Sequence, residues 1–298
     1  MSLKGNGELR VDPSNIKQDF VKINLSVHCC RYWKLTEWEY QNLSFSFWRL
    51  YYNSIDGATV HFKGNNVALN STKVVLIPPF TSFSTSIKHS LNEGLKGSRI
   101  ESLDELDRIK AEGAIDHLFI HFNLGIHFDQ IKPGLFVFDV NHDLIQQIDK
   151  IRNTIIVLNQ TIDNVQSLQI YALLLKLVAR IDASNWIEKT SDTRVLRIIN
   201  YIDKHYSEHL SNEFLADLVS MASNSFLRLF KMEMGLTIQR YLQRIRIDKA
   251  IVEMHNSPVS IDTIAARCGF SDRHHFSKVF KRFTGMPPAQ YRQQKIYY

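Results

Sequence analysis

The 298 residues, 44% of them hydrophobic, suffice for two domains, and the three cysteines suit a reducing cytoplasm better than a disulfide framework. The first 20 residues are polar and charged, and the strongest apolar run, 173–179, is short and contains Lys176. We therefore expect a cytoplasmic protein without a signal peptide, a membrane span or a membrane partner. The net charge of +6 lies entirely in residues 191–298, which hold 16 Lys and Arg against 10 Asp and Glu, as a phosphate-binding surface requires.

After a tail of residues 1–19, residues 20–140 show the pattern of short β-strands. The candidate strands are 21–27, 43–52, 58–62, 73–77, 116–122 and 135–138. Turn signals separate them, including Asp56-Gly57, Gly64-Asn65-Asn66 and Pro133-Gly134. This part of the chain is predicted to form a compact β-barrel or sandwich.

Residues 141–183 change to a helical pattern with two apolar stripes. One stripe comprises Leu144, Ile148, Ile151 and Ile155, and the other comprises Val165, Leu168, Ala172, Leu175 and Ala179. Such helices pack on the barrel alone or also pair two copies of the chain, and the sequence leaves both open. The polar residues 184–193 are predicted to be a linker to a second domain, 194–298.

The second domain begins with a short helix, a turn and a longer helix. Ser211 is placed to cap the short helix, and a turn follows at 220–222. The next helix, 223–234, places Phe226 and Phe230 on one face, and Gly235 ends it as a left-handed C-cap. A further helix over 238–254 leads to a second unit.

The second unit has the same plan. Ser260 caps its short helix, and Gly269 is free to take the positive φ that the turn needs. Ser271 is predicted to cap the longer helix, with Asp272 complementing the helix dipole. Gly285 ends it.

The two units repeat one another about fifty residues apart. Phe226, Phe230-Lys231, Gly235 and Tyr241 recur as Phe276, Phe280-Lys281, Gly285 and Tyr291. Two helix-turn-helix units in tandem form a scaffold that lays helices into DNA major grooves.

The second unit identifies a family. Residues 264–272 (Ile-Ala-Ala-Arg-Cys-Gly-Phe-Ser-Asp), with 276–281 and 285–292, resemble the signature of AraC/XylS-type transcription regulators. The resemblance covers about 195–292 and implies that the second helix of each unit enters the major groove of double-stranded DNA. The implied DNA-binding positions are Asn224, Ser225, Leu227 and Arg228 in the first unit and Arg273, His274, His275 and Lys278 in the second.

The first unit departs from the family pattern. Ala222 stands where a capping serine or threonine is usual, Ser220 replaces a common turn glycine, and Leu227 occupies a position that is often polar. The alternative for each charged position is a solvated surface side chain. Arg273 is the strongest candidate for base contact, because a guanidinium can bind guanine in bidentate fashion.

The strand order of the N-terminal half resembles the cupin-like sensor domain that often accompanies this DNA-binding unit. The matching stretches are 47–52, 74–79 and 117–122. A barrel of this kind can hold one small ligand in its mouth, and the resemblance suggests a sugar. The candidate effector-binding residues are Trp33, Trp38, Trp48, Arg49 and Tyr51, and the alternative is that the aromatic rings fill the barrel.

The sequence therefore predicts an α+β protein with a cupin-like barrel, connecting helices and an all-α domain of two helix-turn-helix units. The resemblance implies a regulator, an activator, that works as a homodimer with RNA polymerase as a partner. A cupin metalloenzyme is the main alternative, since His117 and His121 point the same way on a strand. We expect neither metal nor cofactor, because the chain has no His-x-His cluster. A constitutive architectural DNA-binding protein is a third alternative.

Overall fold

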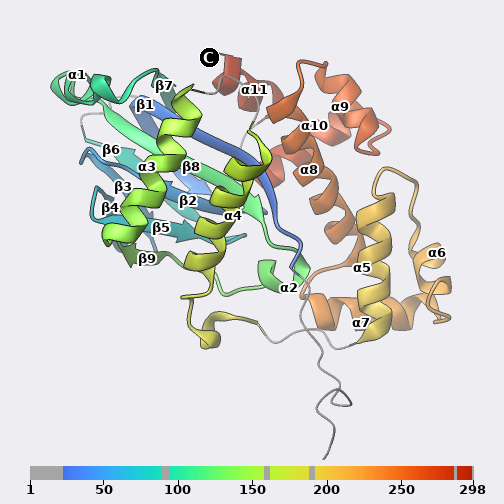
Figure 1. The fold of residues 1–298 in the computed structure, drawn as a ribbon. Coiled ribbons are helices and arrows are strands. Elements are labelled where there is room, and N and C mark those ends of the chain that lie inside the picture. The colour runs from blue at the N-terminus through green and yellow to red at the C-terminus, as the bar shows by residue number, and fades with distance from the viewer. Residues whose placement is uncertain (1–22, 89–93, 158–161, 188–191, 285–286, 297–298) are drawn as a thin grey trace, which may run out of the picture.

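The computed structural model describes residues 23–88, 94–157, 162–187, 192–284 and 287–296, which form a curled sheet with a helical region beside it (Figure 1). The predicted tail, positions 188–191 of the predicted linker and Gly285 lie outside these residues. The predicted α+β architecture is confirmed. Within the described ranges, no helix is both long and apolar enough to cross a membrane.

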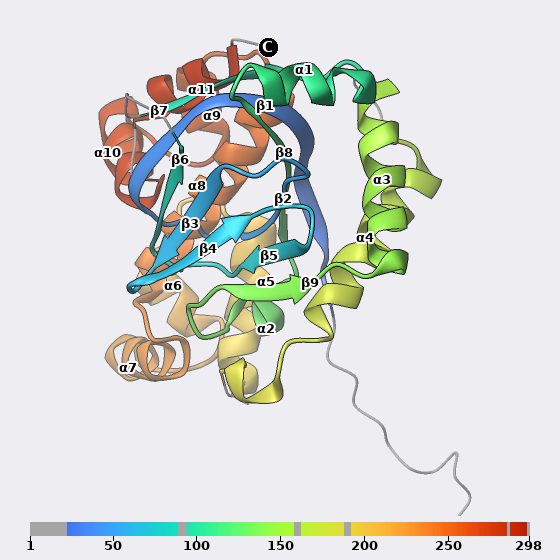
Figure 2. The same cartoon turned by 90° about the vertical axis from the view of Figure 1, so that its left-hand side faces the viewer.

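The sheet is antiparallel at every pairing. Its strands are β1 (Ser26–Leu43), β2 (Trp48–Tyr52), β3 (Ala58–Phe62), β4 (Asn65–Leu69), β5 (Lys73–Ile77), β6 (Phe83–Ile87), β7 (Gly94–Arg99), β8 (Ile115–Asn123) and β9 (Phe136–Asp139). Their order is β4-β3-β6-β1-β8-β2-β5-β9, and β7 pairs with β1. The sheet curls into a half-barrel (Figure 2), in agreement with the curled β architecture that the prediction of a barrel implied.

Strand β1 makes this curl possible. It is 18 residues long and pairs with β6, β7 and β8. Its register shifts between Val27 and Cys29, between Leu35 and Glu37, and between Tyr40 and Leu43. Each bulge bends the strand, so that β1 wraps around the sheet in Figure 2.

The predicted strands 58–62 and 73–77 match β3 and β5, whereas the prediction for β1 was wrong. The expected strand ended at Val27, but β1 continues to Leu43, because its bulges break the period-two alternation that a strand pattern needs. The predicted strand 43–52 is two segments, the end of β1 and β2. Strands β6 and β7 were missed, since polar residues and glycines dominate them. Strand β4 was missed because its first residues, Asn65 and Asn66, were assigned to a turn.

Helices connect and cover the sheet. They are α1 (Leu106–Ala111), α2 (Ile126–Asp129), α3 (His142–Val157) and α4 (Asn164–Val178), with 3-10 turns at Leu103–Glu105 and Ala183–Asn185. Helices α3 and α4 lie over one face of the sheet (Figure 1). Arg152 of α3 reaches the buried Asp116 of β8 at 3.9 Å and donates to the Tyr32 hydroxyl at 2.5 Å. This buried ion pair fixes α3 to the sheet.

The two predicted stripes have different positions in the structure. Leu144, Ile148 and Ile151 of α3 are buried, as predicted. In α4 the buried residues are Ile170, Leu173, Leu174, Leu177 and Val178, which form another face than the predicted stripe. Val165 and Leu168 are each 64% exposed, so the predicted stripe of α4 faces outward.

The C-terminal helices divide between two hydrophobic cores. They are α5 (Thr193–His205), α6 (Asn212–Asp217), α7 (Ser223–Met234), α8 (Ile238–Asn256), α9 (Ile261–Arg267), α10 (Arg273–Thr284) and α11 (Pro288–Ile296). Helices α5, α6 and α7 and the first part of α8 enclose a core of their own. The rest of α8 with α9 and α10 is continuous with the core of the barrel. The second helix-turn-helix unit is thus fused to the barrel, whereas the first is packed separately.

Candidate DNA-binding helices and effector cavity

The first helix-turn-helix unit consists of α6 and α7. The Ser211 side chain caps α6 by accepting from the Phe214 amide at 3.1 Å, as predicted. Ser220 makes the turn with a φ of 53°, the left-handed conformation that its counterpart Gly269 adopts at a φ of 80°. Ala222 precedes α7 and gives it no side-chain cap. Two local features therefore cost this unit stability.

The second unit, α9 and α10, has better local chemistry. Ser260 accepts from the Thr263 amide at 3.1 Å and caps α9, as predicted. The cap of α10 differs from the prediction of Ser271. The helix begins at Arg273, and the Asp272 carboxylate accepts from the His274 and His275 amides at 3.0 and 2.8 Å. These backbone hydrogen bonds stabilise the charged carboxylate and lower the pKa of Asp272.

Each long helix of a unit buries its phenylalanines and exposes its polar face. Phe226, Phe230, Phe276 and Phe280 are fully buried. The predicted DNA-binding residues Asn224, Ser225, Arg228, Arg273, His274, His275 and Lys278 are exposed. Leu227 is half-buried and packs against the first core. The polar faces of α7 and α10 are thus open to a ligand as large as DNA.

Surface contacts hold the two candidate arginines loosely. Arg273 donates to the Asp262 carboxylate at 2.9 Å, and both side chains are more than half exposed. Arg228 donates from Nε to the Asn224 carbonyl at 3.3 Å. Exposed ion pairs contribute roughly 0–1 kcal/mol, so Arg273 can exchange Asp262 for a base edge at little cost.

Helix α8 separates the two units. Its 19 residues correspond to a length of about 28 Å. Figure 1 shows α7 near one end of α8 and α10 near the other. Successive major grooves on one face of B-DNA lie about 34 Å apart. The length of α8 therefore suits two helices that enter adjacent grooves.

The barrel encloses a cavity of about 110 Å³. It is lined by Trp33, Leu35, Trp38, Tyr40, Leu43, Phe45, Arg49, Tyr51, Leu95, His117, Phe119, His121 and Tyr291. Four predicted effector-binding residues therefore lie together, namely Trp33, Trp38, Arg49 and Tyr51. The other one, Trp48, lies on the opposite face of β2, where its indole donates to Asp129 at 2.9 Å.

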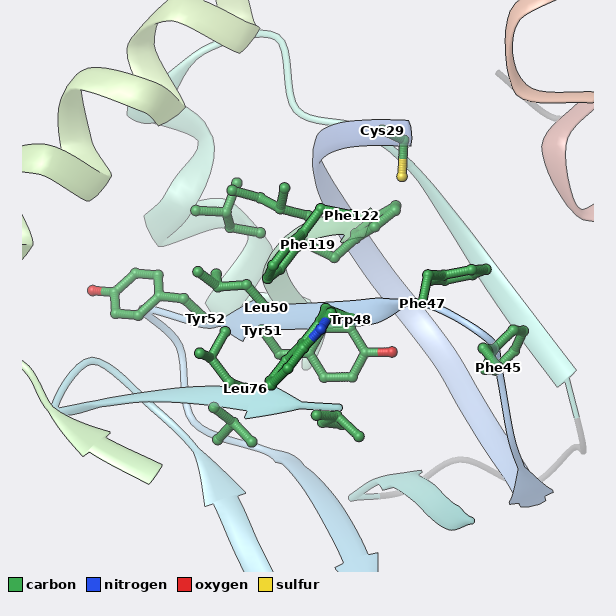
Figure 3. Close-up of a cluster of buried hydrophobic side chains, with 14 of the residues drawn as sticks. Cys29, Phe45, Phe47, Trp48, Leu50, Tyr51, Tyr52, Leu76, Phe119 and Phe122 are labelled. Atoms are coloured by element: carbon green, nitrogen blue, oxygen red, sulfur yellow. The ribbon is translucent and has the colours of Figure 1, made fainter. Parts of the chain in front are cut away.

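Strand alternation explains this difference. Residues 49 and 51 of β2 point to one face, and 48, 50 and 52 point to the other. In Figure 3 the Tyr52 ring extends toward the covering helices, whereas the Tyr51 hydroxyl extends toward Phe45 and Phe47. The alternation along β2 could be read from the sequence, and it separates Trp48 from Arg49 and Tyr51. No sequence pattern places Tyr291 in the cavity, because it comes from α11 in the other half of the chain.

Arg49 dominates the electrostatics of the cavity. It is 5% exposed, its Nη1 donates to the Tyr51 hydroxyl at 2.8 Å, and its guanidinium carbon lies 3.2 Å from the centre of the Phe45 ring. Burial lowers the pKa of Arg49 and raises that of Tyr51. Burial, with the nearby charge of Arg49, also lowers the pKa of His117 to about 3, so this imidazole is neutral.

His117 and His121 both line the cavity, as their spacing on β8 predicts. Nδ1 of His117 lies 2.8 Å from the Asn53 side-chain oxygen, and the His121 ring packs against Phe47 and Phe119. Over the described ranges, no group of three or more His, Cys, Asp or Glu side chains is arranged to hold a metal ion.

Comparisons with known proteins support the helix-turn-helix character of the C-terminal helices. A family model described as a helix-turn-helix domain matches residues 215–294. This match agrees with the resemblance of residues 195–292 to AraC/XylS-type transcription regulators. The chain is 31% identical over 159 residues to the HTH-type transcriptional activator RhaS of Enterobacter sp. (strain 638), a match that covers 52% of this chain and 56% of the relative. It is 34% identical over 123 residues to RhaS of Escherichia fergusonii, 41% of this chain and 44% of that one. The chain thus spans about half the length of the curated relatives it matches.

The whole fold has a counterpart among solved structures. ToxT from Vibrio cholerae matches 89% of this chain and 98% of its own, with a TM-score of 0.56 at 14% identity. At this identity the likeness concerns the fold alone. It shows that a curled sheet followed by a helix-turn-helix region, in this order, is an architecture found in another protein.

Proposed function

We propose that the protein is a sequence-specific, double-stranded-DNA-binding transcription regulator whose DNA binding responds to a small molecule. The observation that carries this proposal is the pair of exposed polar faces on α7 and α10, separated by the length of α8. In this proposal residues 20–140 bind the effector and 194–298 bind DNA. Asn224, Ser225, Leu227 and Arg228 contact one major groove, and Arg273, His274, His275 and Lys278 contact the next.

The test uses DNA selected from a random library by the full chain. Binding to the selected sequence should weaken steeply as salt rises, because each neutralised phosphate releases counterions. Arg273→Ala should lose about 1–3 kcal/mol at one base pair and relax the preference there. Lys281→Ala, on the exposed last turn of α10, is the matched control and should weaken binding to all sequences alike. A flat salt response would refute the proposal.

We further propose that the barrel cavity holds the effector, with a sugar as the class that the family resemblance suggests. Trp33, Trp38 and Tyr51 offer the flat faces on which a sugar ring stacks, and Arg49 offers hydrogen-bond donors. A thermal-shift screen of the full chain against sugars and small organic acids tests this assignment. A ligand in the cavity should raise the unfolding temperature as its concentration rises.

A homodimer is proposed from the outward face of α4. Val165 and Leu168 each expose 64% of their surface on one helix face. Exposure of these apolar side chains to water is unfavourable, so we propose that a second copy of the chain covers them. Leu168→Glu should lower the mass measured by analytical ultracentrifugation from that of a dimer to that of a monomer. Met232→Glu, at a position of α7 that is 73% exposed and lies outside this face, is the control. Since the RhaS relatives are activators by name, we propose activation with RNA polymerase as the partner.

A further inference from the structure

The strand register places two arginines on the cavity face of the sheet. Arg49 of β2 lies opposite His121 of β8, and Tyr51 lies opposite Phe119. All four residues line the cavity. On the other side of β8, Phe119 pairs across Arg31 of β1. Side chains directly opposite one another in an antiparallel pair point to the same face. Arg31 therefore lies on the same face of the sheet, in the row of Phe119 and Tyr51, although it is not among the residues that line the cavity.

These guanidinium groups have unused hydrogen-bonding capacity. Nε of Arg49 and Nε of Arg31 are buried and have no hydrogen-bond partner. Among the residues that the structure places, no carboxylate forms an ion pair with Arg49. Burying a cation without a counter-ion is costly, and its contact with the Phe45 ring offsets the cost in part. The remaining cavity walls are aromatic or aliphatic side chains, including the imidazole rings of His117 and His121.

Tyr291 connects this cavity to a DNA-binding helix. It lines the cavity from α11, and its ring lies 5.3 Å from that of Phe280 in an edge-on contact. Phe280 is a fully buried residue of α10, whose opposite face carries Arg273 and Lys278. One aromatic ring thus stands between the cavity and the second DNA-binding helix.

We propose that the effector is a small organic carboxylate with a flat or apolar body, rather than the sugar that the family resemblance suggests, anchored by Arg49 and packed against Tyr291. The carboxylate supplies the counter-ion that Arg49 lacks and accepts from its free N–H, while the body of the ligand replaces empty space between the aromatic rings. Because the ligand touches Tyr291, its binding shifts the packing of α11 against α10. This inference rests on the proposed function, since it names the class of effector for the same cavity.

The cavity volume limits the size of this ligand. A cavity of about 150 Å³ in another protein accepts benzene. The present cavity is smaller, at about 110 Å³, so a ligand with one ring or a short chain and a carboxylate already fills it and presses on Tyr291. A longer ligand has to displace Tyr291, which moves α11 in the same step.

The experiment compares acids with their neutral amides. The full chain is titrated by calorimetry and thermal shift with benzoate, phenylacetate and hexanoate, with benzamide, phenylacetamide and hexanamide, and with glucose. We expect at least one acid to bind at least tenfold more tightly than its amide. Arg49→Met should weaken that acid at least tenfold, Arg49→Lys should weaken it less, and Arg108→Met, an arginine of α1 that is 66% exposed, should leave it unchanged.

Coupling is measured on DNA selected by the ligand-free chain. A saturating acid should change the dissociation constant of the selected DNA at least fivefold in the wild type, and bound DNA should change the affinity for the acid by the same factor. Any of four results would overturn the inference: equal binding of acids and amides, binding of glucose alone, no binding of any acid, or undiminished binding of the acid by Arg49→Met. Specific DNA binding without ligand is measured separately. If the ligand-free chain binds DNA specifically, the proposed function as a DNA-binding regulator stands even when no carboxylate binds.

Discussion

The turn of the second helix-turn-helix unit makes a sharp prediction about stability. Gly269 has a φ of 80°, and a Cβ built on it would lie 2.6 Å from the Ser207 carbonyl oxygen and 2.8 Å from the Ser207 Cα. Both atoms belong to the backbone after α5, so they have little freedom to move. Gly269→Ala therefore adds a left-handed alanine and a steric overlap at one position.

The magnitude follows from these two terms. A non-glycine residue in the left-handed region costs about 1–2 kcal/mol, and overpacking against fixed atoms costs about 1–3 kcal/mol. The smaller entropy of the unfolded alanine chain returns about 0.4–1 kcal/mol. We expect Gly269→Ala to lower the free energy of unfolding by about 2–4 kcal/mol. The equivalent Ser220 has a φ of 53°, so Ser220→Gly should raise it by about 0.5–1 kcal/mol.

The assay is urea unfolding followed by circular dichroism, with DNA binding measured at a temperature where each variant is folded. The two substitutions occupy equivalent turns, so each serves as the control of the other. A loss below about 0.5 kcal/mol for Gly269→Ala, or effects of the same sign for both, would refute the steric reasoning.

Three further predictions concern single contacts. Ala222→Ser should give α7 the cap it lacks and raise the free energy of unfolding by about 0.5–2 kcal/mol, measured by urea unfolding; an unchanged midpoint would contradict this. Arg152→Met should lower the free energy of unfolding by about 3–5 kcal/mol, because the buried Asp116 then loses its cation. Adding Asp116→Asn to this variant should recover part of the loss. If the effects of the two substitutions simply add, the ion pair between Arg152 and Asp116 does not stabilise the fold. Burial raises the pKa of Asp129 to about 6, so the folded chain holds an extra proton between about pH 4 and pH 6. Stability from this group is present below pH 4 and is lost as pH rises through 6, by up to about 3 kcal/mol. Asp129→Asn should flatten this part of the pH profile of the unfolding temperature, and an unchanged profile would assign the dependence to other groups.

Local signals in the sequence predicted the helical region closely. The bounds of α7 and the start of α8 match the prediction, because caps, phenylalanine spacing and Gly235 all act within a few residues. The cap of α10 was misplaced by one residue, since Ser271 and Asp272 are both good caps and the choice depends on the turn geometry.

Features that depend on distant residues could not be predicted in the same way. The bulges of β1 arise from pairing with three strands, and they hid the strand from an alternation pattern. The outward stripe of α4 is as apolar as the buried one, so composition alone did not distinguish them. The place of Tyr291 in the cavity depends on how the two halves of the chain pack.

The division of the hydrophobic interior has a consequence for how a signal could spread. Ile238, Tyr241 and Leu242 at the start of α8 belong to the first core, and Ile247, Ala250 and Ile251 further along belong to the barrel core. A rearrangement in the barrel thus reaches α10 through their shared core, whereas it reaches α7 through α8 and through the contact of Gln130 with Met234. The base pairs beneath α10 should accordingly respond to the effector more strongly than those beneath α7.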